Sequence, residues 1–124
     1  MFITISPEAP TPIYKQIISQ VRRAIAVGEI KPGDPLPTVR QLAGDLGVNF
    51  NTVANAYRAL AQEGLVETHQ GRGARVIASA KSQYDEHEAR GSLEGFLTEM
   101  MLAGKSDEEI IELVADRLRQ MREG

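Results

Sequence analysis

Apolar residues recur at the spacing of a helical face in three segments of the chain, and this pattern predicts three helices. The first is expected over about 11–27, the second from a cap at Thr38 to about residue 46, and the third over 49–62. Each has one apolar face, which must be buried against the others. The inward positions are Ile13, Ile17, Ile18, Val21 and Ile25, then Val39, Leu42, Ala43 and Leu46, then Val53, Ala56, Tyr57 and Leu60.

Glycine and proline separate these segments. The linker over 29–37 holds three prolines and a glycine, too many for regular structure, and Gly47 supplies a tight turn between the second and third helices. After the third helix, the extended runs 65–68 and 74–77 flank a turn at 71–73 and predict a β-hairpin. Helix, turn, helix and hairpin in this order predict a winged helix-turn-helix, an arrangement that places one helix in a DNA groove.

Two further apolar stripes occupy the last third of the chain and predict a helical hairpin. A break at Ala103 and Gly104 separates them, and Ser106 with Glu109 forms a capping box at the start of the second helix. A two-helix hairpin cannot bury both of its apolar faces alone, so it must pack on the first domain or on a second copy of the chain. The expected contact residues are Leu93, Phe96, Leu97, Met100, Met101, Ile110, Ile111, Val114, Leu118 and Met121.

We therefore expect a mainly α protein with a small β-hairpin, divided into a winged helix-turn-helix domain at 1–79 and a helical segment at 80–124. The charge is divided in the same way. Of the net charge of −3 on 124 residues, residues 1–80 carry +2 and residues 81–124 carry −5. This asymmetry removes the objection that an acidic chain should not bind DNA.

A series of short motifs runs through the predicted helices and hairpin: Gly28-Glu29-Ile30, Pro32-Gly33, Leu36-Pro37-Thr38-Val39-Arg40, Leu42-Ala43, Leu46-Gly47-Val48, Thr52-Val53, Ala56-Tyr57, Leu60, Glu63-Gly64-Leu65 and Gly71-Arg72-Gly73. With these motifs the chain resembles the DNA-binding domain of GntR-family bacterial transcription regulators, over about residues 10–78. The short helical tail and the run 51–53 are most similar to the YtrA-like subgroup. The resemblance implies no large effector domain, and it implies dimerisation through the two C-terminal helices, which favours a second copy over the first domain as their partner.

The start of the second helix is a candidate DNA contact. In the family, positions matching Thr38 and Arg40 contact the operator, and helix N-termini favour phosphate. The guanidinium of Arg40 can clamp phosphates or bind guanine in a bidentate manner. The alternative is an ion pair between Arg40 and Asp45 or Glu63.

The third helix offers Asn49, Asn51, Thr52 and Asn55 for base recognition. Asparagine can pair with adenine through two hydrogen bonds, and threonine can meet a thymine methyl group. One of the first two asparagines is expected to cap the helix and the other to face DNA. Phe50 can contact a thymine methyl group or pack on the domain. The segment 49–57 is uncharged and lacks arginines that many relatives carry, so we expect operator half-sites rich in A·T beneath it.

The hairpin turn is the expected wing. Gly71 and Gly73 allow a tight turn close to DNA, and Arg72 would reach a phosphate or the minor groove. His69 and Gln70 could assist or be plain loop residues. The remaining cations are candidate phosphate contacts or solvated charges: Arg58, Arg75, Lys15 and Arg22.

The expected function is that of a transcriptional regulator, a repressor, that binds a palindromic double-stranded DNA operator as a homodimer. The alternative is a winged-helix module that binds a protein partner.

No cysteine is present and no nucleophile or phosphate-loop pattern occurs, so neither an enzyme nor a cofactor is expected. Asp85, His87 and Glu88 are spaced poorly for a metal site on a helix. No membrane span or signal peptide is predicted, which favours a cytoplasmic location. Binding of a small-molecule effector stays open.

Overall fold

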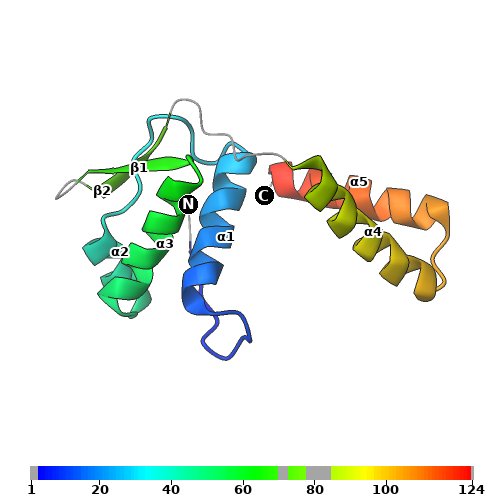
Figure 1. Cartoon of the computed structure of the whole chain (residues 1–124), viewed down its shortest axis with the longest axis horizontal. Helices are drawn as coiled ribbons and strands as arrows, with labels where there is room; N and C mark the ends of the chain where they lie inside the picture. Colours follow the sequence, from blue (N-terminus) through cyan, green and yellow to red (C-terminus); the bar gives the residue numbers. More distant parts are fainter. Residues whose placement is uncertain (1–2, 70–72, 78–84, 124) are drawn as a thin grey trace. The chain divides into compact units, whose positions relative to one another are not determined.

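The computed structural model describes residues 3–69, 73–77 and 85–123. The contacts divide the chain into two compact units between residues 82 and 83. In chain order the elements are α1 (Ile13–Ala26), α2 (Val39–Leu46), α3 (Phe50–Gln62), β1 (Val66–His69), β2 (Gly73–Val76), α4 (Glu86–Leu102) and α5 (Asp107–Glu123). The predicted class, a winged helix-turn-helix followed by C-terminal helices, is confirmed (Figure 1).

The core of the first unit is built around α3, which contacts α1, α2 and β1 (Figure 1). The buried cluster includes Ile17 and Val21 of α1 together with Val53 and Leu60 of α3, and all four side chains are fully buried. The predicted apolar stripes account for this packing, since residues at helical spacing on facing helices form one continuous cluster. One face of α3 is therefore fixed in the core, and its opposite face is left for other contacts.

The helix-turn-helix is held by well-formed helix ends. Thr38 accepts a hydrogen bond from the Gln41 N–H, and the Gln41 side chain accepts one from the Thr38 N–H, so the predicted cap belongs to a complete capping box. Gly47 ends α2 with φ of 68°. This left-handed conformation is strained for residues with a side chain, which explains a glycine at the turn.

The proline-rich linker is more ordered than the sequence predicted. Gly33 donates from its N–H to the Val76 carbonyl at 2.7 Å, Val76 donates to the Asp34 carbonyl at 3.0 Å, and Leu36 donates to the Ala74 carbonyl at 2.8 Å. The linker thus runs along β2 on the side away from β1, which pairs with β2 in an antiparallel register. Proline lacks an N–H but leaves its neighbours free to pair, so counting prolines missed this third extended segment.

An N-terminal arm lies along α1 and is fixed through its backbone. The amide of Gln20 both accepts from the Thr4 N–H and donates to the Thr4 carbonyl. The amide of Gln16 does the same for Ser6. This arm precedes α1, which begins at Ile13, slightly later than predicted, with Pro12 at the cap position and no side-chain cap.

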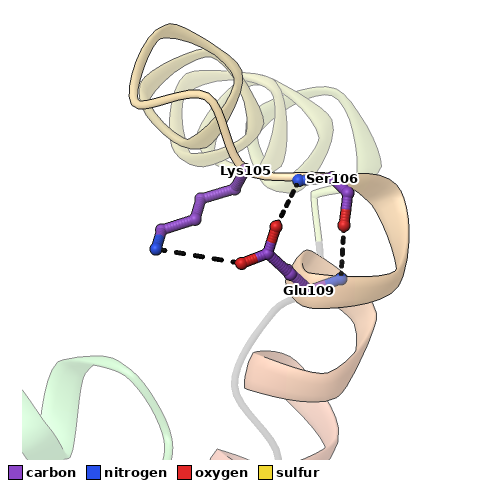
Figure 2. Close-up of polar contacts among 3 residues, drawn as sticks. All are labelled: Lys105, Ser106 and Glu109. Carbon is purple, nitrogen blue, oxygen red and sulfur yellow. Dashed lines mark hydrogen bonds and ion pairs between the residues drawn. The ribbon is translucent and has the colours of Figure 1, made fainter.

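The second unit is the predicted hairpin of α4 and α5. The predicted capping box is present: the Ser106 N–H donates to the Glu109 carboxylate at 3.0 Å, and the Glu109 N–H donates to the Ser106 hydroxyl at 3.2 Å (Figure 2). Lys105 Nζ lies 4.0 Å from the same carboxylate. Within the described part of this unit, Ile110 is the one buried apolar side chain. Large apolar side chains that stay exposed are Leu93, Phe96, Met101, Leu102, Ile111, Leu113, Val114 and Leu118.

The capping box should make the start of α5 sensitive to acid. The Ser106 N–H, and secondarily the Ser106 hydroxyl and Lys105, hold the pKa of Glu109 below its ordinary value. A lowered folded-state pKa means that the carboxylate stabilises the helix above the unfolded value of about 4.3, and that this stability is lost as the pH falls through the folded value. Far-ultraviolet circular dichroism over an acid titration should therefore show a loss of helix at pH values below the ordinary glutamate pKa of about 4.3.

A matched variant separates this carboxylate from the many others. Glu109→Gln keeps an acceptor for the Ser106 N–H but cannot titrate. Its acid transition should be shallower than that of the wild type by the share that Glu109 contributes. Superimposable titrations of the two proteins would contradict the assignment.

Candidate nucleic-acid interface

The N-terminus of α3 resolves the choice between the two asparagines. Asn49 is the cap, because its Oδ1 accepts from the Asn51 N–H at 2.7 Å. The Asn51 side chain is exposed and does not belong to the buried face of α3. Since a capping oxygen is already occupied, Asn51 is the freer of the two amides for any contact outside the protein.

The outer face of α3 is open along its first two turns. Phe50 is 51% exposed, so it does not pack into the domain. Thr52 and Ala54 are partly exposed, and Asn55 is exposed. The face of α3 opposite the core therefore combines one apolar group with amides and a hydroxyl.

Arg40 lies in the first turn of α2 and is exposed. Within the described residues it forms no hydrogen bond or ion pair, and Glu63, one of its predicted alternative partners, is paired instead with Arg22, at 3.3 Å between Nε and Oε2. The alternative of an ion pair from Arg40 to Asp45 or Glu63 is therefore wrong here. Its guanidinium stands beside the free N–H groups of a helix N-terminus, and both attract an anion.

Contacts from two other elements fix the start of α2. The Tyr57 hydroxyl on α3 donates to the Pro37 carbonyl at 2.7 Å. Burial raises the pKa of Tyr57 far above its usual value, so the hydroxyl stays protonated as a donor. On β2, Gly73 has φ of 77°, and a Cβ there would lie 3.4 Å from the Thr38 side chain. The α2 N-terminus is thus hydrogen-bonded to α3 and lies close to the backbone at the start of β2.

Three of the predicted phosphate contacts have partners inside the protein. Arg22 pairs with Glu63, as described above. Arg75 donates to the Gly33 carbonyl at 3.0 Å, which ties β2 to the linker. Arg58 donates to the Asn55 side chain at 2.8 Å. Among the described residues, Lys15 is the one of these four cations whose side chain forms no hydrogen bond or ion pair, so the other three also serve the domain's own geometry.

The tip of the predicted wing lies outside the described residues. Gln70, Gly71 and Arg72 belong to that part of the chain, and β1 ends before it at His69. The described strands nonetheless place the base of the wing beside Thr38, through the close approach of Gly73.

The described part of the chain also bears on two other classes of site. No group of three or more His, Asp or Glu side chains there is arranged to hold a metal ion. No helix in the same residues has the length and hydropathy needed to cross a membrane.

The three packed helices, the capped turn and the two-stranded hairpin define a winged helix-turn-helix protein. Residues 13–76 match the family described as "Bacterial regulatory proteins, gntR family". That segment is more than half of the chain, so the chain belongs to the GntR family.

Individual relatives extend this likeness. The chain is 48% identical over 80 residues to the HTH-type transcriptional repressor YtrA of Bacillus subtilis (strain 168), a match that covers 64% of this chain and 62% of YtrA. It thus spans less than two thirds of that relative's length. A transcriptional antiterminator from Listeria monocytogenes EGD-e superposes with a TM-score of 0.84 at 27% identity, covering 100% of this chain and 94% of that one.

A second similar structure includes DNA. The AraR DNA-binding domain in complex with operator ORX1 superposes with a TM-score of 0.53 at 29% identity, over 60% of this chain and 92% of that chain. The YtrA-like resemblance seen in the sequence is confirmed by the YtrA match.

Removal of the Tyr57 hydroxyl should loosen the α2 N-terminus. Tyr57→Phe keeps the buried ring and leaves the Pro37 carbonyl without its donor, so we expect the free energy of unfolding to fall by about 1 kcal/mol. Urea denaturation of the full chain measures this change. Tyr14→Phe is the matched control, because Tyr14 is 39% exposed and the same atom is removed. Equal effects of the two substitutions would contradict the role given to the Tyr57 hydrogen bond.

Proposed function

We propose that the chain is a transcriptional repressor that binds a palindromic DNA operator as a homodimer, with α3 in the major groove and the wing at 69–73 on the adjacent backbone. Residues Thr38, Arg40, Asn49, Asn51, Thr52, Asn55, Arg58, Gly71 and Arg72 are its DNA-contacting set. The single observation that carries this proposal is the pairing of an exposed polar α3 face with the unpartnered Arg40 at the α2 N-terminus, in a GntR-family fold.

The roles within this set differ. Thr38 and Asn49 cap α2 and α3, so they orient helix N–H groups toward phosphate more than they offer their own side chains. Arg40 supplies charge at the same point. Asn51 and Thr52 meet base edges at the start of α3, where the helix enters the groove, and Phe50 contacts a thymine methyl group. A similar domain in AraR is known with operator DNA, which supports this docking by analogy.

The homodimer is proposed from the second unit. Leu118 is 50% exposed and Val114 is 40% exposed on α5, and Phe96 of α4 lines a groove of about 340 Å³ with them. Such a contiguous apolar surface is costly in water and is covered in most proteins by a partner. A second copy presents the same surface, and a twofold dimer matches two operator half-sites. Ile110 is buried within the hairpin, so its part in the contact is indirect.

An unbiased selection of duplexes bound by the purified full chain tests the proposal. Expected are two inverted half-sites, together with an affinity that falls steeply with salt, by about 0.9 log units per neutralised phosphate for each decade of salt concentration. If the purified protein retains no duplex at low salt, the proposal is contradicted and the alternative of a protein-binding module is favoured.

Loss of Arg40 should weaken operator binding without unfolding the domain. Arg40→Ala removes an exposed guanidinium that has no described partner, and we expect about a tenfold higher Kd and a shallower salt dependence. Fluorescence polarisation on the selected duplex measures both quantities. Arg23→Ala removes the same charge from the last turn of α1 and should change Kd by less than about twofold. Equal losses in the two variants would show a general charge effect rather than a contact at Arg40.

A charge placed on the apolar α5 surface should separate the subunits. Leu118→Asp is expected to give a monomer by light scattering, because a carboxylate would have to be desolvated in the dimer contact. Leu102→Asp is the control: Leu102 is 79% exposed and lies outside both apolar stripes. The monomer should bind a single half-site weakly and lose the preference for paired half-sites. A dimeric Leu118→Asp protein would contradict the proposed interface.

A further inference from the structure

The side chains of Asn55 and Arg58 form a hydrogen-bonded pair on the exposed side of α3. Nη1 of Arg58 donates to Oδ1 of Asn55 at 2.8 Å. The residues are three positions apart, which places them on one helix face, and both are exposed. An amide has one oxygen acceptor and one NH₂ group with two donors. The guanidinium therefore fixes which end of the amide points toward Arg58 and which end is left free.

This pairing changes what Asn55 can offer to a base. To bind adenine with two hydrogen bonds, asparagine must donate to N7 and accept from the N6 amino group. In this protein the accepting oxygen already faces a cation. The adenine amino group would have to approach that oxygen beside a guanidinium whose own N–H groups also donate. The geometry disfavours the adenine pairing that the sequence alone suggested for Asn55.

We propose that Asn55 and Arg58 act as one donor-only unit that selects guanine. The free N–H groups of both side chains donate, and guanine presents two neighbouring acceptors, N7 and O6, in the major groove. Thymine presents one acceptor beside a methyl group, and adenine and cytosine each present a donor. The inference rests on the proposed function, since it requires α3 to lie in the groove. The A·T preference expected for the helix then applies to Asn51 and Thr52 at its start.

Selection of bound duplexes with three forms of the full chain tests the unit. The wild type should return one guanine position in each half-site that is lost in Asn55→Ala. In Arg58→Ala the Asn55 oxygen is released, so the same position should change from guanine to adenine. Replacing that guanine by 7-deazaguanine removes the N7 acceptor and should raise the wild-type Kd about tenfold. The same replacement should change the Kd of Asn55→Ala by less than about twofold.

Two controls keep these results interpretable. Arg23→Ala loses the same charge from α1 and should keep the guanine. Because Asn55 and Arg58 are exposed, their variants should keep the wild-type melting temperature within a few degrees, which circular dichroism checks.

The outcomes distinguish the inference from the function beneath it. If the wild type selects adenine at a position that depends on Asn55, or if both variants keep the wild-type base preferences, the donor-only unit is wrong although the protein reads DNA. Selective binding without any such guanine has the same meaning. If the wild type selects no duplex at all, the proposed function fails and the inference falls with it.

Discussion

The hydrogen bond from the Tyr57 hydroxyl to the Pro37 carbonyl connects the two roles of α3, which packs the core with one face and exposes polar side chains on the other. Tyr57 belongs to the core face of α3, yet its polar end reaches the residue just before the α2 cap. A buried tyrosine needs such a partner, because an unpaired hydroxyl in the core is destabilising. The same contact therefore ties the core face of α3 to the start of α2. The exposed side chains at the start of α2 and on the outer face of α3 are held on helices that this hydrogen bond connects.

Much of this fold follows from patterns that are local in the sequence. Apolar spacing gave the helices to within a residue or two, and the Thr38 and Ser106 caps were recognisable because helix starts use few residue types. Gly47 was identifiable for the same reason, since a left-handed turn favours glycine. The exposed positions of α3 also followed, because a helix that buries one face must show the other. These features depend on neighbours no more than four residues away.

Features that depend on distant partners were not predictable. The pairing of the linker with β2 joins residues about forty apart, and the prolines in the linker argued against it. The cap of α3 could have been Asn49 or Asn51, because both residue types and positions were suitable. The Asn55–Arg58 pair has a spacing that helices allow, but the spacing does not show whether the two side chains meet each other or turn outward. Arg22 and Arg75 were predicted to be phosphate contacts or solvated charges, and their partners inside the domain lie far away in the sequence.

The side-chain amides of Gln16 and Gln20 clamp the backbone of the N-terminal arm, and this clamp limits how the arm can vary. Gln16 and Gln20 are four residues apart on α1, a rise of about 6 Å, and they hold Ser6 and Thr4, which are two residues apart in an extended chain, a rise of about 6.6 Å. The two spacings match, and every bond of the clamp goes to the backbone of the arm. Side chains at Thr4 and Ser6 are therefore free to change over evolution, whereas insertion or deletion of one residue between them would break the register and release the arm.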